Sequence, residues 1–514
     1  MNRARFAVAG WILFISVSLP AAAEVTLPHV ISNGMVLQRG MPLPIWGWAS
    51  PGESVTVTLG DQKMAAIADE DGRWQLRLAP LSAPGPHEMV VTGRNRIVLK
   101  DILVGEVWIA SGQSNMQMTV NASNKAAEET AAAGYPRIRL FSVPRKLAGL
   151  PAADLEAKWE VCSPKTIGAF SAVAYFFGRE LHRQLDVPVG LINTSWGGTR
   201  IEPWTPPFGF AAVPSLQDVT VEIDKANQAY DQGLDPYVAR TKDWVSSVRK
   251  AMKSGRTVAT APAPPEHPLL AKGRQGVTTM YNAMVVPLAP YAIRGALWYQ
   301  GEANTGSGDG MLYHEKMKAL IGGWRKAWGQ GDFPFLYVQL APYQYNARRV
   351  SDTPDRLPRI WEAQLATLSV PNTGMAVITD IGNTKDIHPK NKQEVGRRLS
   401  LWALARTYGR QDLVYSGPLY KSMAVEGNRI RLSFEHIGGG LASRDGKPLT
   451  HFQVAGADRK FVEAQATIDG SSIVVSGGTV TEPVAVRFGW DELAEPNLMN
   501  KEGLPASPFR TDSW

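Results

Sequence analysis

The chain has 514 residues, of which 44% are apolar and 20% charged, and these proportions exclude a disordered or low-complexity protein. The length exceeds that of one compact domain, so two to four folding units are expected. The formal charge of +7 is a mild excess, and no Lys/Arg block with interleaved aromatic residues stands out, which argues against nucleic-acid binding. Cys162 is the single cysteine, so no intrachain disulfide can form, and a buried structural role is favoured for it.

The first 23 residues differ from the rest of the chain. Arg3 and Arg5 precede an apolar run over residues 6–19, and small residues follow at 20–23. This pattern is typical of a secretory signal peptide with an A-x-A cleavage site, whereas the apolar run is shorter than the roughly 20 residues that span a bilayer. We therefore expect a periplasmic or secreted protein that begins near Glu24, has a charge of +5 after losing two arginines, and makes no membrane contact once the signal is cleaved.

Residues 24–103 predict an N-terminal β module. Apolar and polar residues alternate in short runs, as in 54–59 and 74–78, and clusters of turn-forming residues separate these runs. The same pattern returns from 414 to 514, as in 430–434, and predicts a C-terminal β module. The two modules share this texture but no sequence repeat.

Between these modules, residues 104–413 predict an α/β domain. Buried-type strands alternate with longer helical patterns such as 172–184 and 312–329, which is typical of a parallel sheet flanked by helices. A polar, helix-prone stretch at about 205–276 is expected to be an insertion, either a lid or a surface excursion. The predicted strands are 107–110, 187–192, 295–299, 335–340 and 375–379.

The strongest site signal is the segment 107–116, Val-Trp-Ile-Ala-Ser-Gly-Gln-Ser-Asn-Met, in which a buried strand runs into a glycine-containing turn. Ser114 lies at the tip of this turn, and ligand crevices form at the carboxyl ends of parallel strands. A serine in this position is also compatible with a helix cap. Its place after a buried strand makes Ser114 the candidate nucleophile.

A serine nucleophile needs a base, and the segment 386–389, Asp-Ile-His-Pro, supplies a candidate. Imidazole titrates near pH 6.5, so His388 can accept the serine proton while a carboxylate such as Asp386 holds its ring. A lone Asp-x-His is also common as a structural pair. Pro389 suits the first position of a helix that ends by Gly409, which predicts that His388 lies on the loop before that helix.

Three segments carry more specific patterns: 112–116 (Gly-Gln-Ser-Asn-Met), 298–304 (Trp-Tyr-Gln-Gly-Glu-Ala-Asn) and 386–389. Together they resemble the signature blocks of the sialate O-acetylesterase-like branch of the SGNH hydrolases. Segments 280–284 and 496–510 are also similar to that branch, so the resemblance covers nearly the whole chain after residue 23. It implies a flavodoxin-like, three-layer α/β/α domain with accessory β modules and a Ser–His(–Asp) site.

The resemblance further implies that the substrate is an acetylated oligosaccharide. The implied sugars are acetylated hemicelluloses such as xyloglucan, or O-acetylated sialic acids. Family diversity, and no particular residue, favours hemicellulose. The expected reaction releases acetate through an acetyl-serine intermediate.

The resemblance also implies donors for the oxyanion. They are the backbone N–H of Ser114, a glycine of the segment 193–199, and the side chain of Asn304. Gly198 is the preferred glycine, and Gly197 stays open. Asn304 lies in a Gly-Glu-Ala-Asn sequence where the wider superfamily commonly has Gly-x-Asn-Asp.

The sequence leaves the acidic partner open, because the superfamily has its acid three residues before the histidine and this chain has Lys385 there. The acid is therefore Asp386, which is favoured, or Asp380, or it is absent from a Ser–His dyad. For aromatic residues and Gln300, packing is the alternative to a site role. The candidate substrate-binding residues are Gln113, Trp196, Arg200, Glu202, Gln300 and Glu302.

Other enzyme classes fit the sequence less well. A lipase-like α/β-hydrolase needs G-x-S-x-G, and Met116 stands where its last glycine belongs. The eight histidines are scattered and no H-E-x-x-H or paired-cysteine pattern occurs, so no metal or other cofactor is expected. A noncatalytic exported carbohydrate-binding protein is the alternative from another class. The oligomeric state is not predicted.

Overall fold

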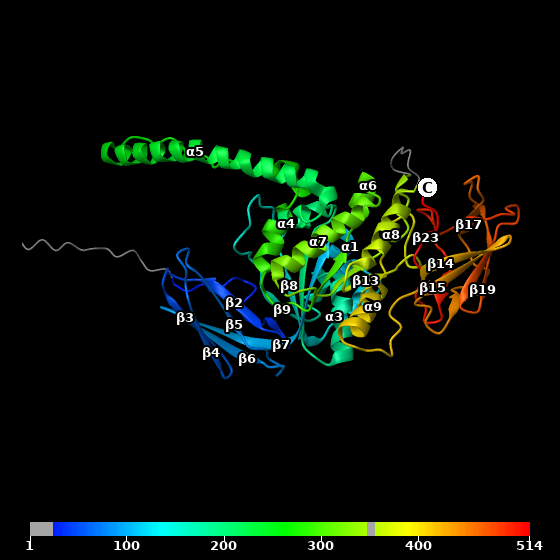
Figure 1. The fold of residues 1–514 in the computed structure, drawn as a ribbon. Coiled ribbons are helices and arrows are strands. Elements are labelled where there is room, and N and C mark those ends of the chain that lie inside the picture. The colour runs from blue at the N-terminus through cyan, green and yellow to red at the C-terminus, as the bar shows by residue number, and fades with distance from the viewer. Residues whose placement is uncertain (1–23, 347–354) are drawn as a thin grey trace, which may run out of the picture.

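The computed structural model describes residues 24–346 and 355–514, and the predicted signal peptide lies outside them. Along the chain it has an N-terminal β part, a central α/β part and a C-terminal β part (Figure 1). The helix α5 (Gln217–Ser254) extends away from this body (Figure 1). Although α5 has 38 residues, no helix among the described residues is long and apolar enough to cross a membrane.

The central part is built on a sheet with the strand order β13-β12-β11-β7-β10-β8-β9. Neighbouring strands from β13 to β8 run parallel, and β9 pairs antiparallel with β8. The five strands predicted for this region are confirmed as β7, β10, β11, β12 and β13, whereas β8 was not predicted. The strands are β7 (Arg96–Gly112), β8 (Tyr135–Ser142), β9 (Trp159–Cys162), β10 (Val189–Ser195), β11 (Gly295–Tyr299), β12 (Phe335–Val338) and β13 (Thr373–Ala376).

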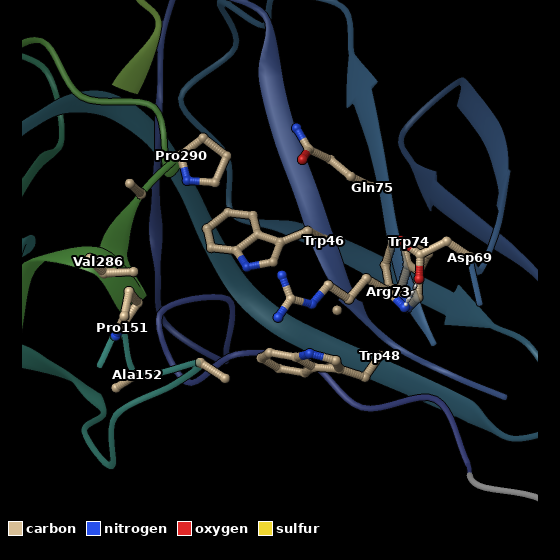
Figure 2. Close-up of a pocket in the computed structure, with 13 residues that line it drawn as sticks. Trp46, Trp48, Asp69, Arg73, Trp74, Gln75, Pro151, Ala152, Val286 and Pro290 are labelled. Atoms are coloured by element: carbon tan, nitrogen blue, oxygen red, sulfur yellow. Dashed lines mark hydrogen bonds between the residues drawn. The ribbon is translucent and has the colours of Figure 1, made fainter. Parts of the chain in front are cut away.

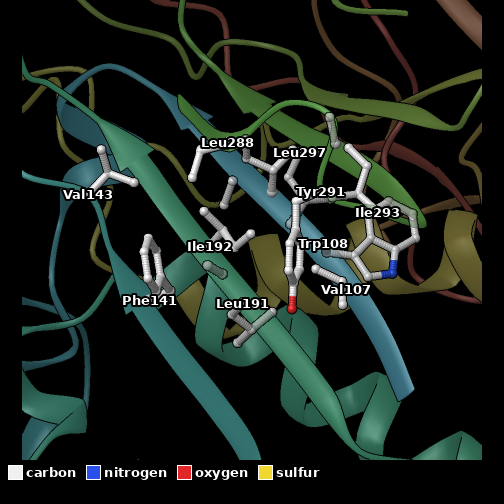
Figure 3. Packing of buried hydrophobic residues seen from close by; sticks show 14 of the residues in the cluster. Val107, Trp108, Phe141, Val143, Leu191, Ile192, Leu288, Tyr291, Ile293 and Leu297 are labelled. Carbon is white, nitrogen blue, oxygen red and sulfur yellow. The ribbon is translucent and has the colours of Figure 1, made fainter. Parts of the chain in front are cut away.

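Helices cover both faces of this sheet. Trp108 of β7 contacts Phe177 of α3 (Ala172–Leu185), with ring centroids 4.9 Å apart. Trp298 of β11 points to the opposite face and contacts Trp324 of α7 (Leu312–Trp328) at 6.4 Å. Figure 3 shows part of the resulting core around β7, β8 and β10, where Tyr291 lies among aliphatic side chains.

The predicted helices 172–184 and 312–329 are confirmed as α3 and α7, but the helix after His388 begins later than predicted. Asn391 caps α9, since its side-chain oxygen accepts a hydrogen bond from the N–H of Glu394 at 3.2 Å. Pro389 therefore lies in the preceding loop with His388. The remaining helices are α1 (Ser114–Gln117), α2 (Ala126–Ala131), α4 (Pro207–Ala211), α6 (Glu302–Ser307), α8 (Arg356–Ala366) and α9 (Lys392–Trp402).

The strand β7 joins the N-terminal β part to the central sheet without a linker. Its first half pairs with β6, its middle with β1, and its second half with β10 and β11. One continuous core extends through both parts, so the predicted boundary at 103/104 falls inside a single strand. The other strands here are β1 (Val36–Gln38), β2 (Leu43–Trp48), β3 (Ser54–Leu59), β4 (Gln62–Ile67), β5 (Arg73–Leu78) and β6 (His87–Thr92).

The C-terminal β part has a core of its own. Arg510 binds Glu362 of α8 at 2.9 Å, and Gln339 donates to Ser507 Oγ at 2.8 Å, so buried polar contacts hold this part to the central sheet. The strands are β14 (Leu419–Glu426), β15 (Arg429–Glu435), β16 (Leu441–Ser443), β17 (Phe452–Ala455), β18 (Val462–Glu463), β19 (Gln465–Asp469), β20 (Ser472–Ser476), β21 (Ala485–Phe488), β22 (Leu498–Asn500) and β23 (Phe509–Arg510).

A fully buried carboxylate, Glu106, stands where β7 enters the central sheet. It accepts hydrogen bonds from Arg39, from Arg294 Nε at 2.7 Å and from the Tyr408 hydroxyl at 2.9 Å. These partners come from the N-terminal part, from the segment before β11 and from the end of the helical region after α9. Glu106 therefore ties three distant stretches of chain to one strand.

We expect Glu106→Ala to lower the free energy of unfolding by about 2–4 kcal/mol, because two guanidinium groups lose their counter-charge in a mostly buried site. Urea unfolding measures this change. Asp412→Ala is the control, since Asp412 pairs with Arg410 on the surface and its loss should leave the midpoint unchanged. Equal midpoints for both variants would contradict the role assigned to Glu106.

Candidate active site

Ser114 is the first residue of the short helix α1, directly beyond the carboxyl end of β7. Gly112 has a φ of +135°, and a Cβ there would lie 2.1 Å from the Tyr299 carbonyl oxygen, so only glycine fits this turn. The N–H of Gln113 donates to the same carbonyl at 2.9 Å. The turn thus presents the Ser114 hydroxyl at the edge of the sheet.

His388 meets this hydroxyl from a loop 274 positions along the chain. Its Nε2 lies 2.9 Å from Ser114 Oγ, which is hydrogen-bonding distance. The other ring nitrogen, Nδ1, lies 3.6 Å from Asp386 Oδ1, and the same carboxylate accepts the backbone N–H of His388 at 3.0 Å. Asp380 is bound by both terminal nitrogens of Arg398 at 2.6 and 2.7 Å, so the acid facing the imidazole is Asp386.

A glycine turn at 197–198 packs against the serine. A Cβ on Gly197 would lie 3.2 Å from the Ser114 Cβ, which shows how closely this turn approaches. The N–H of Gly197 donates to Gln117 Oε1 at 2.6 Å. No acceptor for the N–H of Gly198 occurs in residues 24–346 and 355–514. Of the two glycines, Gly198 is the one with an available donor.

The predicted insertion at 205–276 contributes to this turn. Arg274 Nη1 donates to the Gly197 carbonyl at 2.9 Å, and Gln275 Nε2 donates to the Gly198 carbonyl at 2.7 Å. Both residues belong to a 3₁₀ segment, Pro268–Gln275, that follows α5. The end of the insertion therefore holds the glycine turn in place.

A buried amide, Asn115, connects the serine turn to the histidine loop. Its Nδ2 donates to Glu302 Oε1 at 2.5 Å and to the Ile387 carbonyl at 2.9 Å, while its Oδ1 accepts from Lys392 Nζ at 2.6 Å. Burial lowers the pKa of Lys392 to about 7 and raises the pKa of Glu302 above its usual range. A polar network thus joins the segments that carry Ser114 and His388.

A cleft of about 800 Å³ lies beside this network. Gly198, Arg200 and Glu302 contribute to its wall from the glycine turn and from α6. Tyr343, Tyr345, Arg356 and Ile387 are further lining residues. The cleft presents both charged and aromatic side chains next to the serine turn, so it can receive a polar substrate with ring faces.

Comparisons with known proteins agree on one family. The family model described as carbohydrate esterase, sialic acid-specific acetylesterase, matches residues 104–254 and 269–403. The sialate O-acetylesterase of Rattus norvegicus is 32% identical in an alignment of 454 residues that covers 80% of this chain and 79% of that protein. The Homo sapiens sialate O-acetylesterase is 30% identical over 530 residues, covering 93% and 91%. The chain belongs to this family.

A solved structure adds to these sequence relatives. The crystal structure of a carbohydrate acetylesterase from Xanthomonas citri matches with a TM-score of 0.80 and 35% identity, covering 96% of this chain and 100% of that one. The protein is therefore a carboxylic ester hydrolase, a carbohydrate O-acetylesterase. No finding favours the noncatalytic alternative.

The hydrogen bonds of Asn304 contradict its predicted role as an oxyanion donor. Its Nδ2 donates to Glu202 Oε2 at 3.2 Å and to Asp309 Oδ2 at 2.7 Å, so both amide hydrogens are used. Lys316 Nζ binds the same two carboxylates at 2.8 and 2.6 Å. Asn304 is fully buried in this ionic cluster of the esterase. Its side chain ties α6 to Glu202 and Asp309.

The candidate substrate-binding residues separate into two groups. Arg200 and Glu302 line the cleft. Gln113 and Gln300 are buried and bond to each other at 3.1 Å, so they brace the site from below. Glu202 is likewise buried, with its carboxylate bound to Lys316 and Asn304, and this overturns its predicted contact with sugar hydroxyls.

Trp196 is half-buried against the main core, and its backbone N–H donates to the Gly112 carbonyl at 3.0 Å. It thus supports the serine turn through its backbone. Cys162 is buried, and burial raises the pKa of its thiol to about 12, in keeping with the structural role predicted for it.

Several residues of the site were not recognised from the sequence. Lys392 follows His388 by four positions, but a lysine near a helix start gives no sign of complete burial. Gln117 and Gln275 are ordinary polar residues until folding brings them to the glycine turn. Asn115 lies in the segment 112–116, but nothing in the sequence shows that its side chain contacts the loop of His388.

The environment of His388 favours the neutral ring. Partial burial lowers its pKa, the charge of Asp386 opposes this shift, and the charge of Lys392 adds to it. The net shift is downward. An imidazole with a lowered pKa is unprotonated at neutral pH and can therefore act as a base.

We expect kcat/KM for a small acetate ester to rise with pH along a limb below the ordinary titration range of histidine, because only the neutral ring accepts the serine proton. Asp386→Asn removes the carboxylate that raises the His388 pKa, so this limb should move to lower pH. The plateau value of kcat/KM above this limb should fall roughly 10- to 100-fold, since the His388 ring loses the carboxylate that orients it. A pH–rate profile measures both effects.

Asp380→Asn is the matched control for this prediction. It alters a carboxylate that pairs with Arg398, so it should lower stability while leaving the midpoint of the acid limb in place. If Asp386→Asn has the same profile as the unaltered enzyme, the site works as a Ser114–His388 dyad and the assigned role of Asp386 is wrong.

Proposed function

We propose that the protein is a serine esterase in which Ser114 is the nucleophile and His388 the general base. The contact of 2.9 Å between Ser114 Oγ and His388 Nε2 carries this proposal. His388 takes the hydroxyl proton as Ser114 Oγ attacks the acetyl carbonyl carbon. The oxyanion that forms accepts hydrogen bonds from the N–H groups of Ser114 and Gly198, the two donors that the turns leave available.

The first half-reaction ends when the bond between the acyl carbon and the sugar oxygen breaks. Protonated His388 gives its proton to that oxygen, so the sugar leaves as a neutral alcohol and Ser114 carries the acetyl group. Water then attacks the acetyl carbonyl with His388 again as base. Acetate leaves, and the proton returns to Ser114 Oγ.

We further propose the SGNH, flavodoxin-like three-layer architecture for the central part, supported by a parallel sheet with helices on both faces. Export to the periplasm or outside the cell is part of the same proposal. Its support is the pattern of the first 23 residues, with two arginines, an apolar run and small residues at the end.

The substrate we propose is an O-acetyl ester of a pyranose sugar. Two sources share this chemistry: acetylated hemicellulose such as xyloglucan, and O-acetylated sialic acid, the sugar named for the mammalian relatives. The cleft beside Ser114 has cationic and aromatic walls, which suit hydroxyl groups and ring faces alike.

Ser114→Ala should lower the release of p-nitrophenol from p-nitrophenyl acetate by at least about 10⁴-fold, because no other group supplies the nucleophile. Ser195→Ala is the matched control, since Ser195 Oγ donates to Asn193 at the end of the neighbouring strand β10 and should keep full activity. Mass spectrometry of the quenched enzyme should find one added acetyl group, which Ser114→Ala lacks. Normal turnover by Ser114→Ala would end the proposed mechanism.

Substrate class is decided by measuring acetate release from acetylated xyloglucan oligosaccharides beside O-acetylated sialic acid. We expect one of the two to exceed the other at least tenfold in kcat/KM, because a cleft fitted to one sugar leaves polar groups unpaired with the other. Absence of acetate release from both, with p-nitrophenyl acetate still hydrolysed, would show that the proposed sugar classes are wrong.

A further inference from the structure

A second cleft lies on the N-terminal β part, away from the serine. Its volume is about 390 Å³, and it has no lining residue in common with the cleft beside Ser114. One wall is the outer face of β2 and β5 (Figure 2). The opposite wall consists of residues 151–153 and of Val286, Ala289 and Pro290 from the central part. The cleft therefore lies at the junction of two parts of the molecule.

Two tryptophans of β2 line the β2–β5 wall of this cleft. Trp46 and Trp48 are two positions apart on β2, so their indoles lie on the same face of the strand, about 6–7 Å apart along it. Both side chains are only half-buried, with Gly47 between them (Figure 2). Two half-buried aromatic rings side by side can each pack against a ring of a chain-like ligand.

Polar side chains of β5 lie next to the indoles, on the same face of the β2–β5 pair. Trp46 pairs with Gln75 and Trp48 with Arg73 in the antiparallel register of β2 and β5. Figure 2 shows the Arg73 side chain extending toward both indoles. Arg73 and Gln75 are exposed, and their side chains have no hydrogen-bond partner among residues 24–346 and 355–514. The cleft thus combines apolar ring faces with unused donors and acceptors.

This combination fits the chemistry of a sugar chain. A pyranose ring has C–H groups on its faces, which pack on indoles, and hydroxyl groups around its rim, which a guanidinium and an amide can bind. We propose that this cleft, defined by Trp46, Trp48, Arg73 and Gln75, is a noncatalytic carbohydrate site that holds a glycan chain. The choice of a glycan rests on the esterase's carbohydrate substrate class, and it is independent of which residue attacks the ester.

The test measures glycan binding in a Ser114→Ala background by isothermal titration calorimetry. The probes are xyloglucan oligosaccharides without acetyl groups and sialyllactose, which separate a neutral chain from an acidic one. Trp48→Ala and Arg73→Ala should each weaken binding of the preferred probe about tenfold, while Arg77→Ala should not. Arg77 is the matched control, because it lies on β5 in phase with Arg73 and Gln75 but outside the cleft. Trp46 is left unaltered because it also contacts Tyr291.

Two further measurements separate this proposal from the catalytic one. With Ser114 intact, Trp48→Ala should hydrolyse p-nitrophenyl acetate at the normal rate, and its thermal midpoint should match that of Arg77→Ala. Loss of hydrolysis on Ser114→Ala tests only the catalytic mechanism. Unchanged affinity of Trp48→Ala and Arg73→Ala for both glycans, or no binding of either glycan by the parent, would overturn the second site.

Discussion

The contact between Ser114 and His388 depends on one buried amide, Asn115. Ser114 and His388 are far apart in sequence, and a hydrogen bond between two partly exposed side chains is too weak to hold their loops together. Asn115 supplies the missing constraint, because its side chain reaches the backbone of Ile387, next to His388, and also binds Glu302 and Lys392. An amide has both donors and acceptors, so a single side chain can join the three segments.

The same network sets the charge around the base. Lys392 Nζ lies 4.8 Å from the centre of the Tyr299 ring and is fully buried, which lowers its pKa to about 7. Burial is the largest cause of the lowered pKa of His388, the charge of Lys392 adds to it, and the charge of Asp386 opposes it. These opposing influences leave a neutral imidazole at neutral pH. The buried lysine therefore binds the serine turn through Asn115 and also adds to the downward shift of the His388 pKa.

Strands and the Ser114–His388 pair could be predicted from sequence, because buried strands leave a local apolar pattern and both residues lie in short specific segments. The contacts of Asn304 could not be predicted, since its partner Glu202 comes from a 3₁₀ turn 102 positions earlier. The helix start predicted at Pro389 was wrong, because Asn391, two residues later, caps α9. The choice between Asp386 and Asp380 required the fold, because the sequence does not show that Arg398 binds the Asp380 carboxylate.

The continuous strand β7 gives the two clefts a fixed relation. It carries the turn of Ser114 at one end and forms part of the N-terminal β part at the other, and a single core surrounds it throughout. A glycan held on Trp46 and Trp48 is thus confined near the esterase by a rigid body instead of a flexible linker. A rigid connection raises the local concentration of acetyl esters at the Ser114 cleft only when the bound glycan leaves the second cleft in that direction. The second cleft would then select long substrates over short ones without any change at the serine.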